Sequence, residues 1–158
     1  MNTALLRRVA HHINEQPERF CAAEWAWARN VQAVLHEGAA PEQFRCCIAG
    51  HVLLLSKRLT IQGLLEHSVQ YDDGHLARMA AEAAALTDAQ RNELFYPALW
   101  EDPLRSQYYL TATRADEASV CAQYVSYFVE KHTATAAPDR RAVERHVPTP
   151  ADATLART

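Results

Sequence analysis

The chain contains 158 residues, with 16 basic and 19 acidic side chains and a formal net charge of −3 at pH 7. This length is sufficient for one domain with a sizeable hydrophobic core, and the acidic balance argues against a general nucleic-acid binder that neutralises phosphates. The longest apolar stretch, around residues 52–55, is far shorter than the roughly 20 residues that cross a bilayer, so we expect no membrane-spanning segment.

The cysteines and the N-terminal sequence indicate a compartment. Two of the four cysteines, Cys46 and Cys47, are adjacent in the chain. The N-terminus lacks the basic, apolar and small-residue order of a secretory signal. We therefore expect reduced thiols and a cytoplasmic protein.

The first half of the chain is predicted to form three helices. Apolar residues recur at helical spacing after Thr3, a candidate N-cap, and the pattern stops before Pro17. A second helix is expected in the second half of 18–36, followed by Gly38 in the left-handed conformation common after helices. A third is expected over 46–57, where the run Cys47–Leu55 leaves almost no polar face, as in a buried central helix.

The second half is predicted to contain further helices and one irregular stretch. The helices are expected over 60–67, 75–86 and 87–95, followed by loop and helical turns over 96–110 and by a long helix from 113 or 114 to 132. Thr87 and Gln90 have the spacing of a capping box. No alternation long enough to support a sheet is visible.

These patterns predict an all-α fold: a single compact bundle of about five to seven helices around a buried central helix, spanning residues 1–132. From residue 133 the composition is dominated by Thr, Ala, Pro and Arg, with few large aliphatic side chains. Such a segment cannot bury enough apolar surface to fold alone. We therefore expect residues 133–158 to be a flexible tail that could order on a partner.

Two thiols and an imidazole stand at the predicted start of the central helix. Cys47 and His51 are four residues apart, so a helix would place them on one face. The free N–H groups of a helix start lower the pKa of a cysteine, so Cys46 or Cys47 could be a nucleophile with His51 as its base. The alternative, which we favour because no local signature of a cysteine enzyme is present, is that both cysteines are small packing residues.

Metal binding is a second possible role for these side chains. The candidate ligands are Cys21, His36, Cys47 and His51, with Cys46 beside them, because thiolate and imidazole groups suit zinc. The paired C-x-x-C spacing typical of structural zinc sites is absent. We therefore expect neither a metal nor another cofactor.

Aromatic side chains with polar tips are the candidate binding residues. Trp25, Trp27, Trp100 and Tyr108 could line a ligand pocket or a protein-binding groove, because such side chains bury a large area at low entropic cost. The alternative is that most of them belong to the core. Trp25 and Trp27 cannot both face one core from a helix, so we expect one of them to be exposed or to bridge to a neighbour.

Short motifs follow one another along about residues 5–132. They are Pro17–Phe20, Trp25, Cys47–Gly50, Leu86-Thr87 with Gln90, Leu94–Tyr96, and Trp100. Their order resembles a loosely defined family of small uncharacterised bacterial helical proteins with a C-I-A-G helix start. That family often has an earlier cysteine followed by glycine and threonine, where this chain has Glu42-Gln43-Phe44. The resemblance implies a common helical fold and brings no assigned activity.

The function we predict is a non-catalytic protein-interaction or regulatory module. Its partner would be another protein or a second copy of the chain. The alternative is a thiol-dependent or Cys/His metal-dependent enzyme centred on the segment from Cys46 to His51. An enzyme needs polar groups that converge in an apolar site, whereas here the polar residues mostly fall on predicted solvated faces.

Overall fold

The structure is a computed structural model that describes residues 1–134. Its elements, in chain order, are α1 (Thr3–Glu15), the 3-10 helix η1 (Pro17–Arg19), β1 (Ala26–Trp27), α2 (Val31–Glu37), β2 (Arg45–Cys46), α3 (Ile48–Leu55), α4 (Ile61–Gln70), α5 (Asp73–Ala83), α6 (Asp88–Phe95), the 3-10 helix η2 (Pro97–Leu99), α7 (Leu104–Tyr109) and α8 (Arg114–Ala134). The all-α prediction is confirmed. This part of the chain has eight α-helices against the predicted number of about five to seven, partly because α7 lies in a stretch predicted as loop and helical turns.

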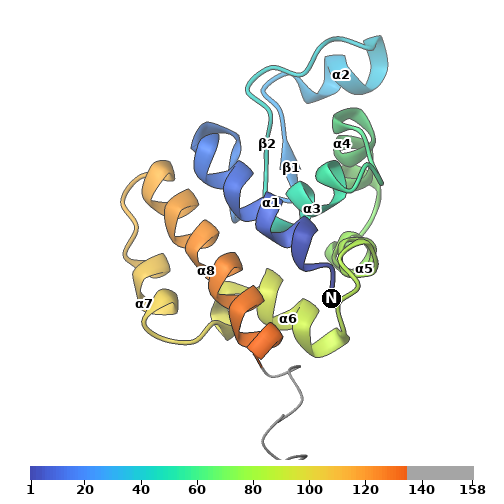
Figure 1. The fold of residues 1–158 in the computed structure, drawn as a ribbon. Coiled ribbons are helices and arrows are strands. Elements are labelled where there is room, and N and C mark those ends of the chain that lie inside the picture. Colours follow the sequence, from blue (N-terminus) through green and yellow to red (C-terminus); the bar gives the residue numbers. More distant parts are fainter. Residues whose placement is uncertain (135–158) are drawn as a thin grey trace, which may run out of the picture.

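The core forms where four helices meet. The long helix α8 packs along α1, and α3 packs against both α1 and α5 (Figure 1). In α3, residues 48–53 are all buried. The prediction of a buried central helix is therefore confirmed, and its lack of a polar face follows from neighbours on more than one side.

Helix ends follow local sequence signals. The side chain of Asn2 accepts a hydrogen bond of 3.1 Å from the Leu5 amide, so Asn2 caps α1 and Thr3 is its first residue rather than its cap. The capping box of α6 is confirmed, with bonds of 3.2 Å from the Gln90 amide to Thr87 Oγ1 and 3.0 Å from the Thr87 amide to Gln90 Oε1. Gly38 ends α2 in the left-handed conformation, as predicted.

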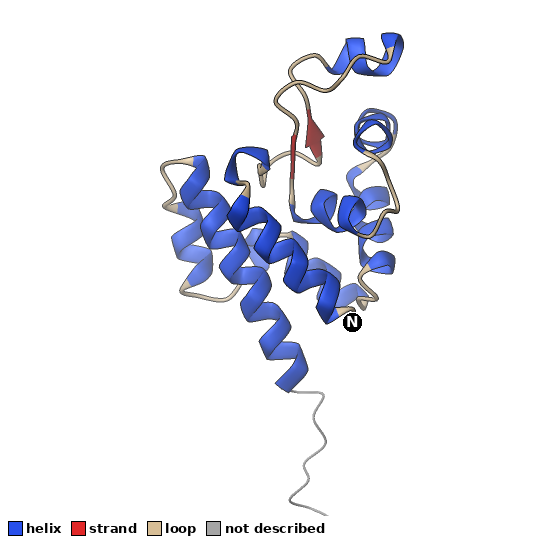
Figure 2. Cartoon of the chain, turned by 45° about the horizontal axis from the view of Figure 1, so that its top comes forward, coloured by secondary structure: helices blue, strands red, loops and turns tan. Residues whose placement is uncertain are grey.

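An arm, which we define as residues 22–46, leaves the helical body and returns to it. Figure 2 shows the two short strands leading from the body to α2. The strands are antiparallel, with Ala26 opposite Cys46 and Trp27 opposite Arg45. The arm also contacts α4 through α2 and β1.

One prediction about the arm is confirmed and one was wrong. The helix expected in the second half of 18–36 is α2, which begins at Val31, whereas Cys46 belongs to β2 instead of a helix. Cys47 has extended backbone dihedrals, with ψ of −177°, and stands at the N-cap of α3. The chain therefore changes from strand to helix at Cys47, and α3 begins at Ile48, two residues after its predicted start.

The C-terminal boundary of the bundle also differs slightly from the prediction. Thr133 and Ala134, which we placed in the tail, are the last residues of α8. The rest of the predicted tail, residues 135–158, lies outside the described residues. Between residues 1 and 134, no helix combines the length and apolar character needed to cross a membrane.

Candidate functional site

The predicted thiol–imidazole site is a buried contact between β2 and the first turn of α3. Cys46 ends β2, and its Sγ lies 3.2 Å from Nδ1 of His51. Cys46 is fully buried and His51 is 2% exposed. The rings of His12 and Phe20 flank the imidazole, with centroid distances of 5.4 and 5.9 Å. The contact therefore pairs His51 with Cys46 and not, as the four-residue spacing suggested, with the thiol of Cys47.

Hydrogen bonding makes His51 an unsuitable base for this thiol. Its Nδ1 also lies 3.0 Å from the carbonyl oxygen of Cys47. A carbonyl oxygen only accepts hydrogen bonds, so Nδ1 carries the proton in this arrangement. A protonated Nδ1 cannot take a proton from the Cys46 thiol, although it can share its hydrogen with the sulfur.

Burial keeps both groups neutral. It raises the pKa of the Cys46 thiol well above its ordinary value and lowers the pKa of His51 to about 4. Nucleophilic catalysis by cysteine requires a thiolate with an assisting base. The pair is instead a thiol and a neutral imidazole within the core, as expected of packing residues.

The neighbouring Cys47 is only partly buried, but its thiol is also protonated. Burial raises its pKa to about 11, which outweighs the lowering by the Gly50 and Ala49 amides at the helix start. The helix start therefore lowers the pKa of Cys47, as the sequence argument held, but burial has the larger effect. Cys47 borders a cavity of only about 10 Å³, shared with Cys121 of α8, which has room for about one water molecule.

The candidate metal ligands do not form a site. Among residues 1–134, no group of three or more His, Cys, Asp or Glu side chains could hold a metal ion. His36 lies exposed on α2 in the arm, whereas His51 is buried in α3. The Nδ1 atom of His51 is engaged by Cys46 and the Cys47 carbonyl, so it does not face a ligand set with Cys21.

The predicted aromatic residues fall into two groups. Trp100 is buried and stacks on Tyr124 at 4.0 Å, its Nε1 donates to the Leu94 carbonyl oxygen at 3.3 Å, and Tyr108 meets its edge at 5.4 Å. Trp100 is therefore a core residue, as the packing alternative anticipated.

Trp25 and Trp27 are both half-buried in the arm. Trp27 lies beneath the guanidinium of Arg45, 3.9 Å from its ring centroid. Arg45 also forms an ion pair of 3.6 Å with Glu24. The expectation that one tryptophan bridges to a neighbour is thus confirmed for Trp27, although the segment is extended instead of helical.

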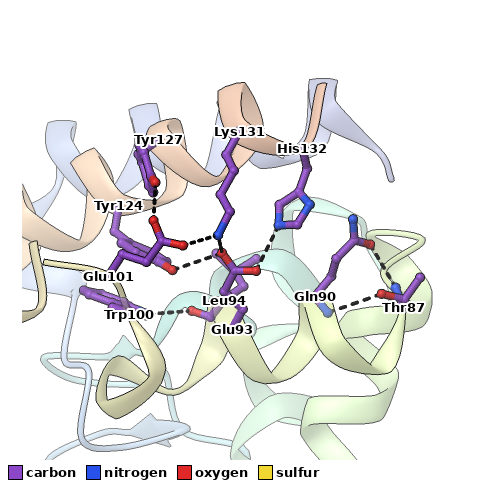
Figure 3. Close-up of polar contacts among 10 residues, drawn as sticks. All are labelled: Thr87, Gln90, Glu93, Leu94, Trp100, Glu101, Tyr124, Tyr127, Lys131 and His132. Carbon is purple, nitrogen blue, oxygen red and sulfur yellow. Dashed lines mark hydrogen bonds and ion pairs between the residues drawn. The ribbon is translucent and has the colours of Figure 1, made fainter. Parts of the chain in front are cut away.

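A polar cluster between α6, the end of η2 and α8 was missed by the sequence reasoning (Figure 3). Lys131 contacts Glu93 at 2.8 Å and Glu101 at 2.5 Å, His132 contacts Glu93 at 3.0 Å, and Tyr127 donates to Glu101 at 2.5 Å. Glu93 and Lys131 are 38 residues apart, so no local spacing could reveal their contact.

Opposite charges, rather than burial, decide the ionisation of this polar cluster. Burial tends to raise the pKa of Glu93, but hydrogen bonds from Lys131 and His132 outweigh it and hold the pKa below its ordinary value. Contacts with Glu101 and Glu93 raise the pKa of Lys131. Glu93 is therefore an ionised partner in a clamp between α6 and α8, and it has no proton to donate as a general acid near neutral pH.

Exposed apolar side chains gather in one short segment. The structure exposes six large apolar side chains within residues 1–134, and four of them belong to Tyr96–Leu110. These four are Tyr96 (38%), Leu99 (58%), Tyr109 (61%) and Leu110 (81%). The sequence reasoning assigned this stretch to loop and helical turns around the core and did not single out Leu99 or Leu110.

Comparisons of the chain with models of protein families, with curated proteins and with solved structures found no significant match. The resemblance to the family with a C-I-A-G helix start therefore stays a prediction.

Proposed function

We propose that this chain is a non-catalytic protein-interaction module whose partner protein docks on the apolar segment Tyr96–Leu110. The observation that carries this proposal is the exposure of Leu99, Tyr109 and Leu110 close together in the sequence. Exposed apolar side chains that gather in one region are typical of interaction sites. Tyrosine is also among the residues that contribute most to binding energy at interfaces.

The segment is anchored, which favours binding. Trp100 follows Leu99 directly and is fixed by its stack on Tyr124 and its bond to the Leu94 carbonyl. Tyr108 precedes Tyr109 and packs against the edge of Trp100. A surface that is ordered before binding loses less conformational entropy when its partner docks.

Charged groups beside the segment already have partners within the chain. Glu101 contacts Lys131, and Asp102 pairs with Arg105 and accepts bonds from Ser106. Apolar contacts, rather than a strong charge of one sign, would therefore provide most of the affinity. This favours a partner protein with an apolar docking surface.

The enzymatic alternative has less support. A thiol-dependent enzyme at the segment from Cys46 to His51 would need an accessible thiol and space for a substrate. A cleft of about 740 Å³ does lie beside α1 and α8, but it is lined by residues such as Asn14, Leu104 and Gln123 and by none of the cysteines.

A substitution pair tests the proposed surface. Leu99→Ser with Leu110→Ser should weaken capture of the partner from native lysate, and then binding of the purified partner, by about tenfold or more, as for loss of a binding hot spot. The matched control is Val69→Ser with Tyr71→Ser, which removes two exposed apolar side chains elsewhere and should leave the affinity unchanged.

Three outcomes would contradict the proposal. One is an equal loss of affinity in the control pair. Another is saturable self-association, measured by sedimentation and abolished by the Leu99 and Leu110 substitutions, which would make a second copy of the chain the occupant. The third is absence of any retained partner together with turnover of a thiol-sensitive substrate, which would favour the enzyme.

A further inference from the structure

Strand register places two of the four cysteines opposite each other. Phe20 and Cys46 form a parallel bridge, and the Cys21 amide donates to the Cys46 carbonyl oxygen at 3.2 Å. One residue further along both segments, Cys21 comes opposite Cys47, whose backbone is still extended. Paired strands lie about 5 Å apart, within the range of about 4.4–6.8 Å between Cα atoms that a disulfide spans.

The alternation of side chains along an extended backbone indicates that the two thiols also share a side. Successive residues of an extended segment point to opposite faces. Phe20 and Cys46 are fully buried, whereas Cys21 and Cys47 are both partly exposed. Cys46 therefore points inward to His51, and this alternation places the Cys21 and Cys47 side chains together on the opposite side of the bridge, where Cys47 borders the small cavity that it shares with Cys121.

We propose that Cys21 and Cys47 form a reversible disulfide when the protein meets a low-molecular-weight disulfide such as oxidised glutathione. The Cys21 thiolate attacks the glutathione disulfide, forms a mixed disulfide and releases one glutathione thiolate. Cys47 then loses its proton to solvent, attacks Cys21 Sγ and releases the second glutathione. Two protein thiols are oxidised, and one glutathione disulfide is reduced to two thiols.

The assignment of roles follows from the environment of Cys47. Its thiol is protonated near neutral pH because burial raises its pKa to about 11, so it is a slow first nucleophile. Once Cys21 carries glutathione, Cys47 needs to attack only a sulfur held beside it, so high local concentration offsets its low thiolate fraction. The rate of the second step should therefore rise with pH.

The disulfide would join the two ends of the arm. Cys21 and Cys47 flank residues 22–46, which contain β1, α2 and β2 and lead away from the helical body (Figure 1). Closing this loop covalently removes conformational freedom from the unfolded chain. The oxidised protein should therefore unfold at a higher temperature than the reduced protein.

Peptide mapping of the full chain tests the linkage. The purified reduced protein is incubated with oxidised glutathione, its remaining thiols are alkylated, and it is digested with trypsin without reductant. Cleavage after arginine and lysine places Cys21 in peptide 20–29, Cys46 and Cys47 in peptide 46–57, and Cys121 in peptide 115–131. We expect a linked pair of 20–29 and 46–57 that dithiothreitol separates.

Two variants identify the linked cysteine of peptide 46–57. Cys47→Ala should abolish the linked pair, whereas the matched Cys46→Ala should retain it. If Cys46→Ala fails to fold because a buried side chain is truncated, fragmentation of the wild-type linked peptide between residues 46 and 47 gives the same information. Cys121→Ala should also retain the link, although Cys121 borders the same small cavity as Cys47.

Other results would overturn the proposal. A link from 46–57 to 115–131 would assign Cys121 as the partner of peptide 46–57. A 20–29 link that persists in Cys47→Ala would assign Cys46. Glutathione adducts without an internal link, or complete absence of reaction in the folded protein, would show that the two sulfur atoms cannot meet.

Discussion

The buried contact of Cys46 with His51 and the polar cluster around Glu93 both join two elements through ionisable side chains, but the first is neutral and the second is charged. In the buried contact, loss of solvent moves the pKa values of thiol and imidazole toward the neutral forms. In the polar cluster, Lys131 and Glu93 stabilise each other's charges while both remain partly exposed. The surroundings of an ionisable side chain, and not its residue type alone, therefore determine whether it is neutral or charged.

The contrast also shows that neither region has the features of a reactive pair. A reactive pair needs groups whose charge can change near neutral pH and that a substrate can reach. Cys46 and His51 lack access to solvent, and Glu93 and Lys131 are held in their charged forms by their contact. One region fills the core and the other fastens α6 to α8. Three experiments can sharpen or break this comparison.

The largest effect is expected at Gly50, which packs against the buried contact. A Cβ added there would lie 2.6 Å from Cys46 Cβ and 2.8 Å from the Trp25 carbonyl oxygen. Because one of these neighbours is backbone, β2 and the arm would have to move. Gly50→Ala should therefore lower the free energy of unfolding by about 3 kcal/mol or more, at the upper end of overpacking costs, as measured by urea denaturation.

Gly63 of α4 is the matched control, because it is also a helical glycine. A Cβ there would come no closer than 3.4 Å to a neighbour, the Oγ1 of Thr60. Gly63→Ala should stabilise the protein by up to about 1 kcal/mol through helix propensity and the unfolded chain. If Gly50→Ala behaved like Gly63→Ala, the close approach of β2 to α3 would be disproved.

The next effect is a dependence of stability on pH that originates at His51. Its pKa is about 4 in the folded protein, below the ordinary value of 6.5. Between these values the unfolded chain binds a proton that the folded chain does not, so stability is full above pH 6.5 and falls as the pH decreases toward 4. From pH 7 to pH 5, the loss should be about 2 kcal/mol, measured by urea denaturation.

Removing the imidazole tests the origin of this slope. His51→Gln should lose most of the dependence between pH 7 and 5, whatever its absolute stability. His12 is the control, because its pKa is also lowered, mainly by burial and then by Arg19 and His11. His12 is less buried than His51, so His12→Gln should remove less of the pH dependence. A wild-type protein with equal stability at pH 7 and 5 would place His51 in contact with solvent.

Sequence periodicity predicted the central helix and most helix positions, because these depend on apolar spacing and local capping. Thr87 and Gln90 illustrate this, since both partners lie within one helical turn. The arm was less predictable. The sequence alone places Cys46 in the apolar helix that follows it. Only its pairing with Phe20 and Ala26 shows that it belongs to a strand.

The candidate site was predictable as a list of residues but not as chemistry. The proximity of a thiol to His51 followed from the sequence, while the identity of the contacting cysteine depended on where the helix begins. The direction of the pKa shifts required burial by residues far away in the chain, such as His12 and Phe20. The contact of Glu93 with Lys131 depends entirely on how α6 meets α8.

The smallest effect is expected in the polar cluster. Glu93→Gln keeps the shape of the side chain but removes the charge that Lys131 and His132 contact, so the free energy of unfolding should fall by about 1 kcal/mol. Because the ion pair is partly exposed, the difference from wild type should shrink in about 1 M salt.

Glu101→Gln is the control for this prediction. Glu101 contacts the same Lys131, but its side chain is 52% exposed, against 20% for Glu93. The loss of stability in Glu101→Gln should therefore be smaller. An equal loss in both variants, or a Glu93→Gln effect unchanged by salt, would show that burial and packing, rather than charge pairing, hold α6 against α8.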